Sequence, residues 1–181
     1  MGHEGANTLS LGSVAIPGVG TIYNAERAET LKAALMAGAD RETANTLAVT
    51  DISDYGAAGF ETANGLDSRY GAGQLNIRNS YRILTGSEQN SAEDGGPNGG
   101  LITARGFDYD ALFGGASGSN ASASYFFTAE NDQLLRAALV WNVDIAAGDT
   151  LAATLRNLDL YLFDLTTGST GTPGGRYRRR G

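Results

Sequence analysis

The sequence predicts an α+β fold, with helices in its first half and an antiparallel β-sandwich in its second half. Apolar residues recur at helical spacing before residue 85 and at alternate positions after residue 100. Between these regions lies a polar, glycine-rich segment, residues 86–100. The 26 glycines and 3 prolines also indicate many turns and short strands. We therefore expect a helical part (1–85), a linker (86–100), a β-sandwich (101–175) and a basic tail (176–181).

The clearest helix is predicted to begin at Asn24 and to end at Gly38. Asn24 can cap the first turn, and Glu26 and Glu29 place negative charge there. The apolar positions that share one face are Ala28, Leu31, Leu35 and Met36. Residues 1–24 are rich in Gly, Ser and Thr, so an irregular lead-in is expected before this helix.

A second helix is predicted from Ile77 to Leu84. Asn76 can cap its start, and Gly86 can end it. The apolar side chains on its common face are Ile77, Tyr81 and Leu84. Residues 43–67, between the two helices, contain turn formers and no clear period, so no regular element is expected there.

The region after the linker is predicted to consist of short strands. Alternating patterns occur at residues 101–104, 124–128, 133–145 and 157–164. In the last of these, Leu158, Leu160 and Leu162 alternate with Asp159, Tyr161 and Phe163, so the two sets are expected on opposite faces. These strands are too few to close a sandwich or jelly roll. Either the β-domain is incomplete or further strands lack a visible pattern.

The charge balance argues against a nucleic-acid partner. The chain has 13 basic and 20 acidic residues, a net charge of −7. Without the four arginines of residues 176–181, 9 basic and 20 acidic residues give a net charge of −11. Such an acidic body repels phosphate backbones. The basic tail is either an arm that binds polyanions or an end without a role of its own.

Targeting and redox features are sparse. No run of apolar residues is long enough to span a membrane, so no membrane span is expected. Cysteine is absent, which removes disulfides, thiol catalysis and cysteine-ligated zinc. The first residues lack the features of a signal peptide, so for a secreted protein the targeting segment is expected upstream of Met1.

The sequence contains no complete catalytic constellation. The only histidine is His3, which is expected to be solvated near the chain end rather than part of a Ser–His–Asp triad. Carboxylates that could form an acid/base pair or a calcium site are Asp51, Asp54, Glu61, Asp159 and Asp164. No EF-hand spacing is present, so these side chains are expected to be solvated. Calcium stays a candidate cofactor without assigned ligands.

Two segments resemble the C-terminal portion of subtilisin-like serine proteases. Residues 29–40, ETLKAALMAGAD, are similar to a late helix of that catalytic domain. Residues 64–84, NGLDSRYGAGQLNIRNSYRIL, are similar to the family's closing phrase, in which a glycine turn precedes a helix begun by asparagine. The residues that carry this second match are Tyr70, Gly71, Gly73, Leu75 and Asn76.

A third pair of segments resembles the jelly-roll domain attached to many secreted subtilisin-like proteases. Residues 137–145 read AALVWNVDI and residues 156–164 read RNLDLYLFD. The resemblance implies that residues 1–85 end an α/β catalytic domain and that residues 101–175 form the appended sandwich. It implies a secreted, extracellular serine endopeptidase that acts on protein or peptide substrates.

The family nucleophile stands in a Gly-Thr-Ser-x-Ala-x-Pro motif that opens a buried helix. This chain matches that motif only through Ser13, Ala15 and Pro17, and the glycines of residues 18–21 cannot continue a helix. We therefore treat Ser13 as a look-alike and assign no catalytic residue. The triad is expected outside this chain, so the isolated chain is expected to be inactive.

Two other functions remain open at this point. The chain could be a non-catalytic extracellular module that binds a polysaccharide or a cell surface, with Tyr109, Tyr125 and Tyr161 stacking on sugars. It could also be a structural domain stabilised by calcium. The binding module does not account for the helical phrases at residues 29–40 and 64–84.

Overall fold

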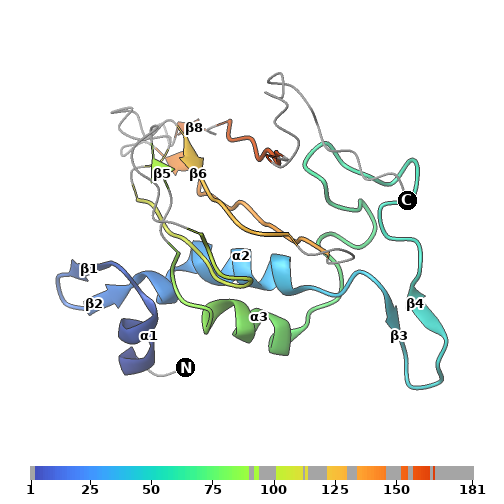
Figure 1. Ribbon diagram of the computed structural model, residues 1–181, viewed down its shortest axis with the longest axis horizontal. Helices are drawn as coiled ribbons and strands as arrows, with labels where there is room; N and C mark the ends of the chain where they lie inside the picture. Colours follow the sequence, from blue (N-terminus) through green and yellow to red (C-terminus); the bar gives the residue numbers. More distant parts are fainter. Residues whose placement is uncertain are drawn as a thin grey trace. The chain divides into compact units, whose positions relative to one another are not determined.

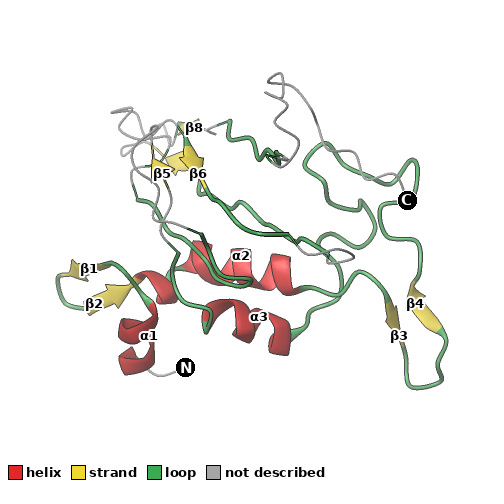
Figure 2. Ribbon diagram, viewed as in Figure 1, coloured by secondary structure: helices red, strands yellow, loops and turns green. Residues whose placement is uncertain are grey.

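The structure is a computed structural model, and it describes residues 3–89, 92–93, 101–111, 113, 122–129, 134–145, 152–154, 157–163 and 165. These residues form three α-helices, one 3-10 helix and eight short strands. The strands pair into four two-stranded antiparallel sheets, none of which closes on itself (Figures 1 and 2). The predicted mixture of helices and antiparallel strands is confirmed, whereas no sandwich or jelly roll is formed by the described residues.

The beginning of the chain is regular, so the expected irregular lead-in is wrong. Helix α1 spans His3–Leu9. Strand β1, Ser13–Ile16, pairs antiparallel with strand β2, Gly20–Tyr23. Gly18 has a φ of 79° and Gly20 a φ of 112° in the turn of this hairpin. Glycine adopts such angles without the strain that a side chain would add, which is why this glycine-rich segment can reverse direction.

A small apolar core explains why this first region is ordered. Its buried members are Ala6 of α1, Ala25 and Phe107. The partly buried side chains that pack against them are Leu9, Tyr23 and Leu84. Because Phe107 comes from far along the chain, no local pattern around residues 1–24 could reveal this contact.

The first predicted helix begins later than expected. Asn24 lies in a 3-10 helix, η1 (Asn24–Glu26), and α2 spans Ala28–Gly38. The N-cap of α2 is Arg27, whose side chain makes no capping hydrogen bond. Asn24 does not cap α2, because its side-chain amide donates to Glu88 Oε1 at 2.8 Å. The predicted end of the helix is confirmed.

The second predicted helix is confirmed at both ends. Helix α3 spans Ile77–Leu84, and Asn76 is its N-cap. Asn76 Oδ1 accepts a hydrogen bond from the backbone N–H of Asn79 at 3.0 Å. Beyond the last turn, the N–H of Gly86 donates to the carbonyl of Arg82 at 3.1 Å. Local capping chemistry therefore sets the length of this helix.

Helices α2 and α3 pack side by side (Figure 1). A Cβ at Gly38 would lie 2.7 Å from the backbone nitrogen of Ser80, so only glycine allows this approach. Next to it, Asp40 and Gln74 exchange two backbone hydrogen bonds of 2.8 Å. Gly73, with a φ of 116°, approaches the carbonyl of Asp40 so closely that a Cβ would lie 2.3 Å from that oxygen. The absence of a side chain at Gly38 and Gly73 thus allows the two helical segments to approach closely.

A hairpin and a long loop connect the two helices. Strands β3, Thr43–Ala44, and β4, Thr50–Ile52, pair antiparallel with a shift in register, in a range where no regular element was expected. The loop that follows contains five glycines with positive φ: Gly56, Gly59, Gly65, Gly71 and Gly73. This concentration of glycine explains how the loop can turn repeatedly.

The strand predictions after residue 100 are confirmed only in part. Strand β6, Ala123–Ser124, overlaps one predicted strand and pairs with β5, Ala92–Glu93. In place of the strand predicted over residues 101–104, the structure has an isolated β-bridge between Leu101 and Phe126. Arg136, in the extended segment that follows, donates to the carbonyl of Ala39 at 2.6 Å and so ties this segment to the end of α2.

The two long predicted strands are wrong over most of their length. Of the strand predicted over residues 133–145, the described residues form only β7, Asp144–Ile145. It pairs with β8, Ala153–Thr154. Residues 157–163 form no strand, and Leu160 is 61% exposed. Alternation predicts which side chains share a face, but a strand also needs a hydrogen-bonded neighbour.

The chain forms two compact units, Met1–Trp141 and Asn142–Gly181. The linker expected at residues 86–100 is described at 86–89 and 92–93, and a division there stays a prediction. The basic tail at residues 176–181 lies outside the described residues. Of the helices that the structure describes, none has the length and apolar character to cross a membrane.

Candidate functional site

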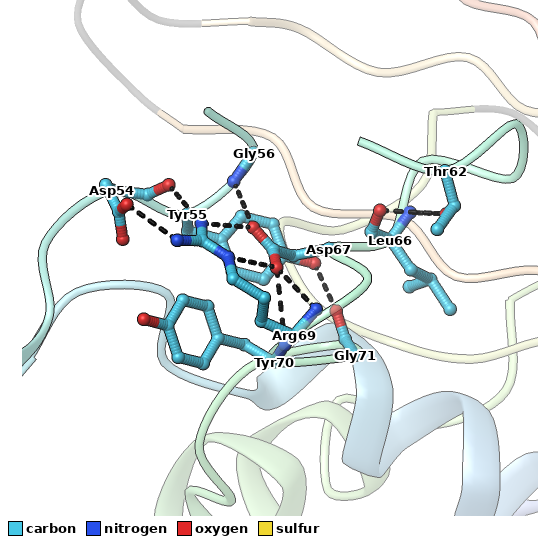
Figure 3. Close-up of polar contacts among 9 residues, drawn as sticks. All are labelled: Asp54, Tyr55, Gly56, Thr62, Leu66, Asp67, Arg69, Tyr70 and Gly71. Atoms are coloured by element: carbon cyan, nitrogen blue, oxygen red, sulfur yellow. Dashed lines mark hydrogen bonds and ion pairs between the residues drawn. The ribbon is translucent and has the colours of Figure 1, made fainter. Parts of the chain in front are cut away.

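A polar cluster in the loop after β4 is built around Asp67 (Figure 3). The Asp67 side chain is completely buried. Its oxygens accept hydrogen bonds from the backbone N–H groups of Gly56 at 2.9 Å, Arg69 at 2.8 Å and Tyr70 at 3.3 Å. The Asp67 carboxylate therefore joins two separate stretches of the loop, one at Gly56 and one at residues 69–70.

The guanidinium of Arg69 completes this cluster. Its Nε and Nη2 donate to Asp67 at 3.2 and 3.0 Å, and its Nη1 donates to Asp54 Oδ2 at 2.8 Å. The guanidinium carbon lies 3.6 Å from the ring centroid of Phe60 and 4.7 Å from that of Tyr70. Arg69 is thus held by charge at its edge and by aromatic rings over its plane.

The charges of this cluster are strongly stabilised. Hydrogen bonds, first from the Arg69 side chain and then from backbone N–H groups, hold the pKa of Asp67 well below its usual range. The bonds to Asp67 and then to Asp54 raise the pKa of Arg69. A general acid or base needs a pKa near the working pH. The Asp67–Arg69 pair is therefore suited to organising the loop and not to transferring protons.

Neighbouring contacts close the rest of the loop. The hydroxyl of Tyr55 donates to the carbonyl of Gly71 at 2.6 Å, and the guanidinium of Arg41 lies 4.7 Å from the Tyr55 ring centroid. At the other end, Thr62 Oγ1 donates to the carbonyl of Leu66 at 2.8 Å. Figure 3 draws Tyr55, Thr62, Leu66 and Gly71 together with the Asp67–Arg69 pair. The loop is a cross-linked unit that leads directly into α3.

The carboxylates considered from the sequence do not converge on one site. Asp54 belongs to the Arg69 cluster, whereas exposed Asp51 accepts a hydrogen bond of 3.4 Å from Asn45. Exposed Glu61 forms a backbone bridge with Asp67. In the described part of the chain, no three His, Cys, Asp or Glu side chains form a group that could hold a metal ion. Asp159 is exposed, and Asp164 lies outside the described residues.

His3 is partnered but remains accessible. Its Nδ1 lies 3.0 Å from Glu26 Oε1, and its ring centroid lies 4.9 Å from that of Tyr23. The Tyr23 N–H donates to Glu26 Oε2 at 3.0 Å. This backbone bond, and then the bond with His3, lowers the pKa of Glu26. The pair borders an open depression of about 440 Å³ whose other lining residues are Val19, Gly20, Thr21 and Ile22.

Ser13 lies at the start of β1 and is exposed. Its strand turns back at Gly18 into β2, so no helix follows it. The hydrogen bond that His3 makes among the described residues is with Glu26. Ser13 therefore begins a hairpin strand, whereas the serine of the motif that it partly matches opens a helix, and its treatment as a look-alike stays a prediction.

The aromatic side chains considered for sugar binding have different surroundings. Tyr109 lies under the guanidinium of Arg27, with 4.7 Å between the guanidinium carbon and the ring centroid. The hydroxyl of Tyr125 donates to Asp108 at 2.6 Å. Tyr161 stacks with Phe163 in the second unit.

Sequence reasoning missed the two residues with the most structural influence. Arg69 was not singled out, although an aspartate two residues before an arginine, between Gly65 and Gly71, is a pattern typical of a polar turn. Glu88 was read as part of a linker. It is buried and accepts hydrogen bonds from the N–H of Leu11 and the side chain of Asn24. No sequence pattern near Glu88 predicts these contacts.

Comparison of the chain with protein-family models, with curated proteins and with solved structures finds no match. What indicates a function is therefore the sequence resemblance, together with the positions that the structure gives to the residues that carry it.

Proposed function

We propose that this chain is the C-terminal part of a secreted subtilisin-like serine endopeptidase, in which it supplies scaffold rather than catalytic groups. The observation that carries the proposal is the contact between the two helical phrases of the resemblance. The first phrase forms most of α2, and the second forms the glycine turn and α3. Gly38 of one phrase meets Ser80 of the other. The two segments that resemble the same protein family thus pack against each other.

The outer face of this helix pair supports a scaffold role. Leu31 and Leu35 of α2 are each 41% exposed, and Ile77 and Tyr81 of α3 are 63% and 55% exposed. They line one depression together with Ala6 of α1, Ala25 and Glu26 of η1, and Ser80 and Leu84 of α3. Helices with an open apolar face normally pack on another layer. In the proposed enzyme that layer is the sheet of the catalytic domain.

The coding sequence upstream of Met1 tests this proposal. We expect an open frame with a Gly-Thr-Ser-x-Ala-x-Pro phrase before the present chain, and a longer product that hydrolyses a fluorogenic peptide. In that product, serine-to-alanine substitution within the phrase should abolish hydrolysis, whereas Ser13→Ala should leave it unchanged. A stop codon without such a phrase, or peptide hydrolysis by the present chain that is lost in Ser13→Ala, would contradict the proposal.

The helix contact can be tested in the same longer product. Gly38→Val places a branched side chain against Ser80, so it should lower the yield of active enzyme at least about tenfold. Leu47→Ala, at a side chain that is 80% exposed, serves as the control and should have no effect. Equal activity of the two variants would argue against a scaffold role for α2 and α3.

A further inference from the structure

An asparagine followed by glycine lies in an exposed turn of the loop that contains Asp67. Asn64 and Gly65 are both exposed, and Gly65 has a φ of 75°. A Cβ placed on Gly65 would meet no atom within 4 Å beyond its chain neighbours, so the space beside its backbone is open. Of the asparagines that the structure describes, Asn64 alone is followed by glycine. This position therefore combines a carboxamide with an unobstructed backbone nitrogen in contact with water.

Hydrogen bonds of the main chain define the turn around this pair. The Gly65 N–H donates to the carbonyl of Thr62 at 3.0 Å, and the Thr62 N–H donates to the carbonyl of Leu66 at 2.8 Å. Next to them, a backbone bridge joins Glu61 to Asp67. The length of the main chain within the turn thus sets the pairing of the segment that carries Asp67.

The Thr62 hydroxyl acts on the Asn64 side chain. Its Oγ1 donates to Asn64 Oδ1 at 2.5 Å, as well as to the carbonyl of Leu66. A donor on Oδ1 polarises the carboxamide and stabilises the negative charge that this oxygen gains when a nucleophile adds to Cγ. The backbone nitrogen of the following residue reaches Cγ by closing a five-membered ring, and at Gly65 no side chain hinders this approach.

We propose that Asn64 is a site of spontaneous deamidation, a modification that requires only water. The Gly65 nitrogen gives its proton to solvent and bonds to Asn64 Cγ. The bond from Cγ to Nδ2 then breaks, and Nδ2 takes up protons from solvent and leaves as ammonia. Water opens the resulting cyclic imide. Its addition to Cγ gives aspartate, whereas its addition to the main-chain carbonyl gives isoaspartate, so that overall one water replaces one ammonia.

The hydrogen bond from Gly65 to Thr62 must open before the nitrogen can attack. This bond lies within an exposed turn, and such bonds break in local fluctuations that leave the rest of the fold intact. Deamidation therefore does not require the Asp67 cluster to unfold. The inference goes beyond the proposed scaffold function and does not depend on it, because the reaction involves only groups of this loop.

The two products affect the loop differently. Aspartate adds one negative charge and leaves the main chain unchanged. In isoaspartate the main chain runs through the former side chain, so it gains one methylene inside the turn. The hydrogen bonds between Thr62 and Leu66 then lose their spacing, and the bridge between Glu61 and Asp67 loses its support.

Peptide mapping of the full chain by mass spectrometry, after incubation of the folded protein, tests this inference. Trypsin releases residues 42–69 as one peptide, which also contains Asn45 as an internal control. We expect conversion at Asn64 to be at least about tenfold faster than at Asn45, where the branched side chain of Thr46 hinders attack. Conversion at Asn64 should also be at least about tenfold faster at about pH 9 than at about pH 7, because the attacking nitrogen must lose its proton.

Asn64→Gln is the matched control, because its longer side chain would have to close a larger ring and should stay unconverted. The inference is overturned if Asn64 stays intact in the folded chain over a time in which the same chain in urea is converted there. Equal rates at Asn64 and Asn45 would overturn it as well.

Hydrogen exchange tests the effect on the loop. In the isoaspartate product, separated by ion exchange, the amides of Thr62 and Leu66 should exchange at least about tenfold faster than in the unmodified chain. Asn64→Asp, which adds the charge without the methylene, should leave both rates unchanged. Unchanged exchange in the isoaspartate product would overturn the effect assigned to this modification.

Discussion

Asp67 stays charged although it is buried, because N–H donors surround its carboxylate. Three of the hydrogen bonds come from backbone N–H groups, and two come from the guanidinium of Arg69. A buried carboxylate is stable only when it is paired and hydrogen-bonded in this way. The conformation of the loop after β4 therefore depends on one side chain.

Asp67→Asn should loosen this loop while keeping the size of the side chain. The amide loses the negative charge and turns an NH₂ group toward N–H donors, so the hydrogen bonds of Gly56 and Tyr70 should weaken. We expect their amides to exchange with deuterium at least about tenfold faster. Asp51→Asn, at an exposed position in β4, is the control and should leave both rates unchanged. Unchanged exchange in Asp67→Asn would contradict the role assigned to this carboxylate.

The same loop should resist acid. Because the pKa of Asp67 in the folded chain is lowered from its ordinary value of 3.8, its contribution to stability is present above that value. This contribution is lost progressively as the pH falls from that value toward the lower, folded-state pKa. After correction for intrinsic rates, protection of the Gly56 and Tyr70 amides should stay nearly constant from about pH 7 to about pH 5 and should fall progressively below about pH 4. Protection that does not change between about pH 5 and about pH 3 would show that folding does not lower the pKa of Asp67.

At the level of the elements, the two helices differ in how far local sequence predicts them. Asn76 caps α3 through Asn79, three residues away, so the signal and the contact lie together. Asn24 has the same chemistry but bonds to Glu88. A capping residue can therefore be recognised from sequence only when no distant group competes for its side chain.

Gly38→Ala tests the packing of α2 on α3. Helix propensity alone predicts stabilisation by about 1 kcal/mol, because alanine is the better helix former. The new Cβ would lie 2.7 Å from both the backbone nitrogen and Oγ of Ser80, so we expect destabilisation by about 1–3 kcal/mol. Urea denaturation measures this difference, with Lys32→Ala on the exposed face of α2 as the control. Stabilisation of the Gly38→Ala variant would mean that the helices are not in close contact.

At the scale of the whole molecule, Glu88 connects parts of the chain that are distant in sequence. It accepts hydrogen bonds from Leu11, just before β1, and from Asn24, at the start of η1. Its own N–H donates to the carbonyl of Leu9 at the end of α1. Glu88 thus attaches the N-terminal region to the segment after α3 at three points, in addition to the apolar contact of Phe107.

Glu88→Gln should weaken this attachment. The carboxylate accepts on both oxygens, and an amide can accept on only one, so one buried N–H loses its partner. We expect the free energy of unfolding to fall by about 1–3 kcal/mol. Glu42→Gln, at an exposed position, should change it by less than about 0.5 kcal/mol. Equal stability of the two variants would show that the Glu88 bonds contribute little.

The long strands show the limit of prediction from pattern. The alternation over residues 157–163 is regular, and the stacking of Tyr161 on Phe163 agrees with the face that it predicts. The same pattern does not form a strand, and Leu160 stays exposed. Side-chain alternation is a property of one segment, whereas a sheet is a property of at least two.

Local sequence predicts the presence of helices, the span of α3 and the end of α2. These follow from capping groups and apolar spacing within a few residues, where few other partners are within reach. The rest of the fold depends on tertiary contacts. It placed Asn24 against Glu88, Phe107 against Ala6 and Arg136 against Ala39. These contacts join residues far apart in sequence, and their formation depends on packing rather than on local preference.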